Sequence, residues 1–512
     1  MPVWSKALHV VAAARTAAAG WRLRRNVDEA GTQRDAWQHL VMQLARTKFW
    51  SARGVGTGMT LGQFRSRVPL HTYAEIEPAV RRMRTGEADV LWPGVCRRYA
   101  STAGVEHNAP RVLPVTEGLL GHVRRASFDA LALQRLRTGL RQLNRGHTWL
   151  CGSPAQLRAP EGEGAAVSTV GAAPDALVFP GFLAAGGFVS GECVARIPAW
   201  PAEGGTLALN LPPGDVGLIA GSPPAVVQIG RAQAASGHAW ASLQCLVLGG
   251  VPWTPYADEL RTLFGPRVQF HEIYAAAEAI IAAQAGAPGQ GLRVLADHGV
   301  YFEFLPMSDF DAGAVAGKGD KTVPLADVAT GVDYAIVLTT PGGLARHVLG
   351  DVVRFVARQP ARLIYVGHTR LRLNGAGENL PESELTDALA RLCRRRGWRT
   401  VHFHVAPWQE SPSAPPRHEW WIELRAGTVE TPMGGFMAPE LDDDLQRVNP
   451  CYSHVRQSGR LAAPIVRLVM PGVFEQWLRA TGRWDGHLKF ARCRPDRQIA
   501  DALAALTQFA SV

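Results

Sequence analysis

Acidic and aromatic side chains follow strand-like runs at two points of the chain. Asp351 comes shortly after the alternating run Tyr334–Thr340 and a Gly-Gly turn, with Arg346 five residues before it. A carboxylate in that place can accept two hydrogen bonds at once, which suits two neighbouring ribose hydroxyls. Tyr274 and Glu278 lie four residues apart, where they can stack on an adenine and hold a magnesium ion between phosphates. Each pattern alone also fits a surface turn or a buried tyrosine.

A polar loop and a late lysine are suited to phosphate groups. The loop with Ser101, Thr102 and Gly104 offers hydroxyls and backbone N–H groups, and Arg111 follows it. Lys489 is one of only five lysines in a chain with 54 basic residues. A lone ammonium on a loop can neutralise charge on a transferring phosphoryl group, although a solvated surface lysine is the plain alternative.

The composition indicates a globular protein of several domains. The 512 residues exceed what one core needs and suffice for two or three domains. Hydrophobic residues make up 47% and charged residues 19%, which excludes a disordered chain. No apolar window is long enough for a transmembrane helix, so no membrane partner is expected. The charge of +10 is spread along the chain, so no nucleic-acid partner is expected either.

The seven cysteines are dispersed and none forms a CxxC pair. An odd, scattered set is typical of reduced thiols, so we predict a cytoplasmic protein without a disulfide frame or a zinc site. The first residues favour an amphipathic surface helix over a signal peptide, because Arg15 interrupts the apolar run.

Strands alternate with helices over most of the chain. A βαβ-like rhythm covers residues 215–264, and residues 299–307 form a strand pattern with period two. This order predicts an α/β fold with layered sheets. We also predict a short strand at 89–94, one long helix at 117–145, and a strand followed by a loop at 268–284.

A polar, hinge-like segment near 367–375 precedes a different pattern. A helix, alternating strands and a further helix follow it, which predicts a compact α+β unit. We therefore divide the chain into a large N-terminal domain, 1–367, and a small C-terminal domain, 368–512.

These segments, in this order, resemble the acyl acid–amido synthetases of the Gretchen Hagen type. This auxin-responsive family of adenylate-forming enzymes was first known from plants and is also found in bacteria. The resemblance is carried by FRSRVPLHTYAEIEPAVRRMRTGEADVLWPG, STAGVEHNAPRVLPVT, LGGVPWTPY, YAAAEAIIAAQ, GVYFEFLPM, TTPGGLARHVLGDVVRF, YVGHTR, NGAGENL, HEWWIEL, LDDDLQRVN and GHLKFAR.

The resemblance implies an adenylate-forming enzyme fold with a large layered α/β domain and a small mobile α+β domain. It implies ATP and Mg²⁺ as cofactors, a small-molecule carboxylic acid and an amino acid or other amine as substrates, and a monomer. It also implies these roles: Ser101, Thr102, Gly104 and Arg111 at the phosphates, Tyr274 at adenine, Asp351 at ribose, Arg346 and His368 elsewhere at the nucleotide, Glu278 at the metal, and Lys489 at the adenylation transition state.

The chain departs from the family pattern at several of these positions. Val105 and Glu106 stand where hydroxyl residues are usual, Arg111 replaces a lysine, and His347 replaces a tyrosine. Three interpretations follow: an active synthetase, a degenerate non-catalytic relative that serves as a binding partner, and, less favoured, a coenzyme A thioester ligase. The acyl pocket is expected between helix 117–145 and residues 248–253, with Trp253 and Tyr256 near it.

Overall fold

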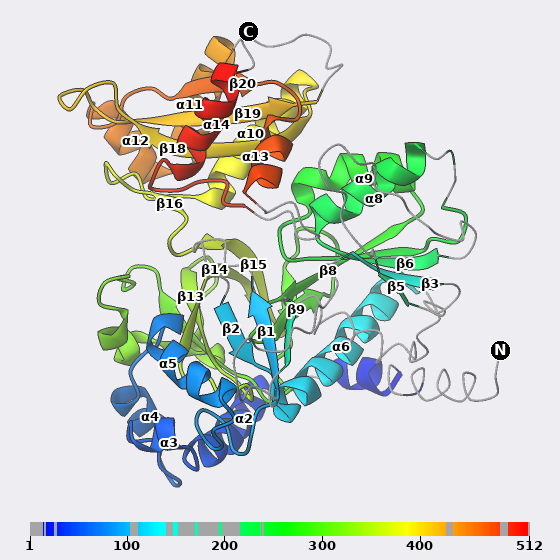
Figure 1. Cartoon of the computed structure of the whole chain (residues 1–512), viewed down its shortest axis with the longest axis vertical. Coiled ribbons are helices and arrows are strands. Elements are labelled where there is room, and N and C mark those ends of the chain that lie inside the picture. Colours follow the sequence, from blue (N-terminus) through cyan, green and yellow to red (C-terminus); the bar gives the residue numbers. More distant parts are fainter. Residues whose placement is uncertain are drawn as a thin grey trace. The chain divides into compact units, whose positions relative to one another are not determined.

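The computed structural model describes the chain as two compact units, which divide between Tyr365 and Val366 (Figure 1). It describes residues 14, 17–24, 28–102, 111–139, 147–151, 169–172, 194–196, 216–235, 237, 240–425, 434–481 and 490–509. None of the described helices is long and apolar enough to cross a membrane.

Twelve of the described strands form one mixed sheet. They are β3 (His147–Cys151), β5 (Val194–Arg196), β6 (Val216–Gly221), β7 (Cys245–Gly249), β8 (Gln269–Ala275), β9 (Ile280–Gln284), β10 (Leu292–Val294), β11 (Tyr301–Pro306), β12 (Val323–Pro324), β13 (Asp333–Thr339), β14 (His347–Arg358) and β15 (Ala361–His368). Their order is β12-β11-β13-β14-β15-β10-β9-β8-β7-β6-β3-β5. The strands from β5 to β8 pair in parallel, and β8 pairs with β9 in antiparallel fashion.

Helices cover both faces of the parallel part of this sheet (Figure 1). Helix α6 (Glu117–Thr138) packs on one face, against Leu218 and Val247. Helices α8 (Pro223–Ala235) and α9 (Ala257–Phe264) pack on the other face, against Ile219 and Leu246. Neighbouring residues of one strand therefore face different helices, which is why these strands are apolar throughout. The predicted α/β class is confirmed.

The N-terminal helices form a separate cluster beside the turn that precedes β14. These are α2 (Glu29–Leu44), α3 (Lys48–Ser51), α4 (Leu61–Arg67) and α5 (Tyr73–Arg84). The Trp50 indole, fully buried among them, donates to the Gly343 carbonyl at 2.8 Å. Gly343 has φ +93°, and a Cβ there would lie 2.7 Å from the Leu91 carbonyl oxygen, so the turn requires glycine.

A three-stranded sheet carries the first predicted loop. Its strands are β1 (Arg98–Thr102), β2 (Arg111–Pro114) and β4 (Thr169–Ala172), in the order β2-β1-β4. Thr102 pairs with Arg111 across the antiparallel β1–β2 ladder. The strand predicted at 89–94 is wrong: these residues form bends, and the Asp89 carboxylate accepts a bond from the Gly94 N–H at 2.7 Å. Short acidic side chains favour such turns over strands.

The second unit is an α+β arrangement. It contains β16 (Arg372–Leu373), β17 (Leu380–Pro381), α10 (Glu382–Arg396), β18 (Thr400–Trp408), β19 (Arg417–Leu424), α11 (Gly434–Val448), α12 (Pro450–Gln457), β20 (Ile465–Val469), α13 (Val473–Ala480) and α14 (Gln498–Phe509). Strand β19 pairs with β18 in antiparallel and with β20 in parallel fashion. Trp420 on β19 is fully buried and stacks on Phe403 of β18.

Candidate active site

Tyr274 and Asp351 meet although 77 residues separate them. The Tyr274 hydroxyl, at the end of β8, donates to Oδ2 of Asp351 on β14 at 2.5 Å. The Tyr365 ring of β15 meets the Tyr274 ring edge to face at 6.0 Å. Burial, and then the charge of Asp351, raise the pKa of Tyr274 far above its ordinary value. The phenol is therefore a neutral donor that fixes the orientation of the carboxylate.

An irregularity in the β13–β14 ladder brings Asp351 to this place. Ala335 pairs with Val352 and Val337 with Val348, so three residues of β14 lie opposite one residue of β13. Gly350, in the middle of these three, has φ +99°. Bulges of this kind bend a strand and redirect side chains, and the left-handed conformation is the one that glycine adopts without strain.

Glu278 lies in the tight turn between β8 and β9. The turn is closed by a bond from the Ala276 N–H to the Ala279 carbonyl at 2.9 Å. Buried His122 of α6 accepts a bond from the Ile280 N–H at 3.0 Å. The sequence predicted a loop here, whereas the chain returns at once as β9, because the apolar run Ile280–Gln284 pairs with β8 and β10.

The Glu278 carboxyl is 7% exposed. Burial raises its pKa to about 7, the charge of Asp351 adds to that rise, and Arg111 opposes it. An additional positive charge beside this carboxyl would therefore stabilise its ionised form strongly.

Arg111 begins β2 and stands at the returning end of the β1–β2 hairpin. Its guanidinium lies over the Tyr73 ring, 5.8 Å from the centroid. Its charge lowers the pKa of both Glu278 and His347. A cationic residue predicted for phosphate is thus grouped electrostatically with the residue predicted for metal.

The other predicted phosphate residues are described only in part. Ser101 and Thr102 lie in β1, and their side chains are outside the described residues. Gly104 and Lys489 lie outside them altogether.

His347, for which the sequence suggested no role, lies beside Glu278. It is 1% exposed, and its Nε2 is 3.8 Å from Oε1 of Glu278. Burial, followed by the charges of Arg111 and His71, lowers the pKa of His347 to about 3. His71 pairs with His347 in a parallel bridge, and its carbonyl accepts from the Val348 N–H at 2.8 Å. A neutral imidazole therefore borders the candidate metal residue.

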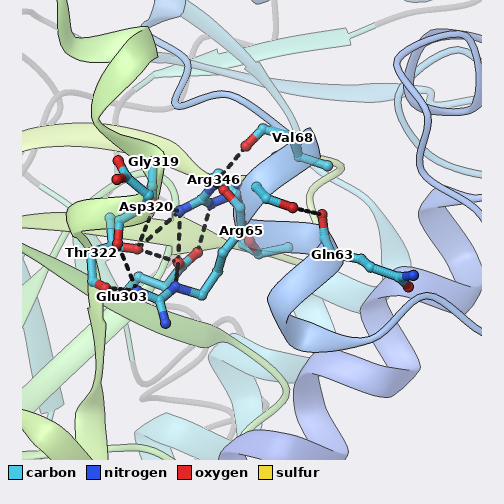
Figure 2. A network of polar contacts seen from close by, with 10 residues as sticks. Gln63, Arg65, Val68, Glu303, Gly319, Asp320, Thr322 and Arg346 are labelled. Carbon is cyan, nitrogen blue, oxygen red and sulfur yellow. Dashed lines mark hydrogen bonds and ion pairs between the residues drawn. The ribbon is translucent and has the colours of Figure 1, made fainter.

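Arg346 has a different role from the predicted one. Figure 2 shows its guanidinium enclosed by Glu303 of β11, Thr322 and the chain around α4. Its acceptors, at 2.6–3.0 Å, are the Glu303 carboxylate, the Thr322 hydroxyl and the carbonyl oxygens of Arg65, Val68 and Gly319. The residue is 0% exposed, and all five N–H groups have acceptors. The prediction that Arg346 contacts the nucleotide is corrected, because no donor is left for it.

His368 belongs to the second unit, at the end of β15. Its Nδ1 accepts a bond from the Arg370 N–H at 3.3 Å, and its carbonyl accepts from the Leu371 N–H at 3.1 Å. These bonds make a compact turn at the predicted hinge. The role of His368 at the nucleotide stays a prediction.

A second acidic cluster lies elsewhere in the first unit. Among the described residues, Asp129, Asp297 and His298 have ligand atoms close enough to hold a metal. Arg22, however, forms ion pairs with both carboxylates, and His298 Nε2 lies 2.8 Å from Asp129. A cation is therefore already present, and the cluster is an ion-pair network.

Trp253, which is expected near the acyl pocket, is buried against neighbouring side chains. Trp253 is 7% exposed and meets Phe270 edge to face, and its indole N–H donates to Oε2 of Glu272 at 3.1 Å. Burial raises the pKa of Glu272 to about 6, against the opposing effect of that bond. Glu272 lies two residues before Tyr274 and thus on the same face of β8.

Solved structures with the same fold define the class. The chain matches GH3.15 acyl acid amido synthetase with a TM-score of 0.72 at 15% identity, covering 94% of both chains. It matches 2-hydroxyisobutyryl-CoA ligase in complex with 2-HIB-AMP with a TM-score of 0.60 at 14% identity, covering 95% of this chain and 93% of that one. The fold is that of adenylate-forming ligases, as the resemblance implied.

Family models match most of the chain. They describe the GH3 family N-terminal domain at residues 23–171, its central domain at 293–366 and its C-terminal domain at 383–498. A relative from Oryza sativa subsp. japonica, the probable indole-3-acetic acid-amido synthetase GH3.12, is 24% identical and covered over 92% of both chains. The chain belongs to the GH3 family.

Proposed function

We propose that this chain is an ATP-dependent acyl acid–amido synthetase. The observation that carries the proposal is the contact of Tyr274 with Asp351, with Glu278 and Arg111 grouped beside them, in a member of the GH3 family. Its named relatives are amido synthetases. The chemistry that this grouping suits is the activation of a carboxylic acid by a nucleotide.

In the proposed reaction, a carboxylate oxygen of the acid attacks the α-phosphorus of ATP and pyrophosphate leaves. The amine then attacks the acyl carbon, AMP leaves with the bonding electrons, and loss of a proton gives the amide. Asp351 would hold the ribose hydroxyls, with Tyr274 fixing its orientation at 2.5 Å. Arg111 would compensate phosphate charge, and the catalysis required is positioning and neutralisation.

The residues around Glu278 fit a divalent cation. The buried carboxyl has a raised pKa, and the neighbouring His347 nitrogens have no hydrogen-bond partner in the described part of the chain. A bound cation would neutralise charge on the phosphates. We propose Mg²⁺ or a similar ion for this place, with Glu278 as a ligand.

The identity of the acid substrate and of the amine substrate can be found by testing candidate compounds. The rice relative is named for indole-3-acetic acid, and the GH3.15 enzyme was solved in complex with 2,4-DB. A carboxylic acid with an aromatic ring is therefore the first class to test, with amino acids as acceptors. A monomer and a cytoplasmic location remain predictions.

The test is ATP–pyrophosphate exchange with the purified full chain, Mg²⁺ or Mn²⁺, and a panel of aromatic and aliphatic acids. We expect exchange that depends on one class of acid.

Lys489→Ala should lower exchange far more than it weakens ATP binding, because the proposed contact forms mainly in the transition state. ATP binding without acid-dependent exchange would favour the non-catalytic relative. A thioester formed with coenzyme A in place of an amide would favour the third interpretation.

A further inference from the structure

The imidazole of His347 is the least satisfied polar group of the candidate site. It is 1% exposed, and within the described residues neither Nδ1 nor Nε2 has a hydrogen-bond partner. A buried polar group without a partner lowers the stability of the folded protein. Native proteins seldom retain such a group without a function, a water molecule or an ion to account for it.

The position of this ring suits a metal ligand. The distance of 3.8 Å between Nε2 of His347 and Oε1 of Glu278 is too long for a hydrogen bond. Metal–nitrogen and metal–oxygen bonds of roughly 2.0–2.2 Å place two ligand atoms of one ion between about 3 Å apart, when they are neighbours, and about 4 Å apart, when they are opposite, and the observed distance lies within these limits. A neutral imidazole nitrogen that makes no hydrogen bond offers its lone pair to a metal ion.

The backbone on both sides of His347 is fixed. Arg346 has φ +48°, and its five guanidinium N–H groups anchor it to α4, β11 and residues 319–322. The bridge from His71 secures the following residue through the Val348 N–H. The ring is thus presented to Glu278 by a rigid frame, which is the arrangement that a precise ligand set requires.

Arg111 determines whether a bare metal ion or a metal–nucleotide complex is favoured beside Glu278 and His347. Its positive charge acts on both Glu278 and His347, which disfavours a bare ion beside them. When the cation is bound to phosphate groups, the negative charge of those groups interacts favourably with Arg111. The environment therefore favours a metal–nucleotide complex over the metal alone.

We propose that His347 supplies an imidazole nitrogen to the cation of the bound nucleotide, beside Glu278, and that this ligand set makes the chain prefer Mn²⁺ to Mg²⁺. Mg²⁺ favours an all-oxygen octahedron, whereas later first-row ions accept imidazole readily. This inference rests on the proposed function, because it assumes that a nucleotide binds here.

The experiment compares ATP binding in excess Mg²⁺ and in excess Mn²⁺ by calorimetry, for wild type, His347→Leu and His271→Leu. His271 is a matched control, because it is also fully buried and its pKa is also lowered to about 3, but it lies on the opposite face of β8 from Tyr274. We expect wild type and His271→Leu to bind Mn²⁺·ATP about tenfold more tightly than Mg²⁺·ATP. In His347→Leu the two affinities should become equal through weaker Mn²⁺·ATP binding.

A spectroscopic measurement tests the bond itself. Pulsed electron paramagnetic resonance on the Mn²⁺ complex with ¹⁵N-labelled ATP detects ¹⁴N only from the protein. We expect ¹⁴N modulation in wild type and His271→Leu and none in His347→Leu. If His347→Leu is unstable, His347→Phe supplies the same comparison, because its ring carries no nitrogen.

The outcomes separate the two proposals. Equal affinity for Mg²⁺·ATP and Mn²⁺·ATP in wild type, without ¹⁴N modulation, would overturn the role of His347 and leave the nucleotide site intact. Failure of ATP to bind with either ion would count against the proposed function itself. Tight binding of Mn²⁺ without ATP would contradict the argument from Arg111.

Discussion

The bond between Tyr274 and Asp351 gives the first test at the scale of a residue. Asp351→Asn should weaken ATP binding by roughly 30–100-fold, because the charged acceptor proposed for two ribose hydroxyls is lost. Tyr274→Phe removes only the 2.5 Å bond that orients Asp351 and should weaken binding by about 3–10-fold. Calorimetry with purified protein measures both effects.

A modified nucleotide supplies the control. 2′,3′-Dideoxy-ATP lacks the two hydroxyls, so Asp351→Asn should leave its affinity nearly unchanged. An equal loss for ATP and the dideoxy analogue would mean that Asp351 acts through the fold and not through the ribose.

The residues differ in how far the sequence predicted them. The pattern of strands predicted Tyr274 and Glu278 at the end of a strand and just after it, where they lie, whereas Asp351, predicted after a strand, lies inside β14. Arg346 was misassigned because its acceptors come from residues up to 281 positions away, which no local pattern reveals. His347 was noted only as a departure from the family pattern, and no role was assigned to it from the sequence.

At the scale of elements, the Arg346–Glu303 pair joins α4, β11 and the turn before β14. Arg346→Met should lower the free energy of unfolding by about 3–5 kcal/mol, because Glu303, which is 1% exposed, would keep a charge without its main partner. Chemical denaturation of the full chain measures the loss. Arg231→Met, which removes a partly exposed pair with Glu259, should cost much less.

A double substitution separates charge from packing. Arg346→Met with Glu303→Leu should recover part of the lost stability, because neither buried charge then remains. Recovery should be incomplete, since the carbonyl oxygens of Arg65, Val68 and Gly319 also lose their donor. A double variant as unstable as Arg346→Met would show that the loss comes from those carbonyls.

The parallel strands and their helices were the elements best predicted, since apolar strands between helical patterns leave few alternatives. Strand β9 was missed because the tight turn at Glu278 contains only alanines beside it, without a glycine, proline or asparagine to mark it. The helix predicted at 117–145 ends at Thr138, where Gly139 adopts φ +69°.

At the scale of the whole molecule, buried histidines make the fold sensitive to acid. Burial is the largest cause that lowers the pKa of His71 and His404 to about 4 and of His122, His271 and His347 to about 3. Each is neutral when folded and takes up a proton when unfolded below about pH 6.5. Each therefore removes stability as the pH falls from about 6.5 towards its folded pKa, and has no effect above that range.

A single substitution isolates one such contribution. Carboxyl groups with raised pKa values, such as Glu272 and Glu278, act in the opposite sense, so only a difference between variants is informative. His271→Leu should reduce the loss of stability between pH 7.5 and pH 5 by about 2 kcal/mol relative to wild type. Denaturation curves at the two pH values measure the free energy of unfolding of wild type and variant. If both proteins lose the same free energy between pH 7.5 and pH 5, a neutral buried His271 is refuted.

The β1–β2 hairpin has a consequence for how this chain can change. Thr102 and Arg111 are paired, so the eight residues between them begin and end on adjacent strands of one ladder. The β1–β2 ladder therefore fixes the separation between the two ends of segment 103–110, whichever residues the segment contains. We expect that segments of equal length from other family members can be exchanged between these two ends, and such exchanges test the proposed role of this hairpin in phosphate binding.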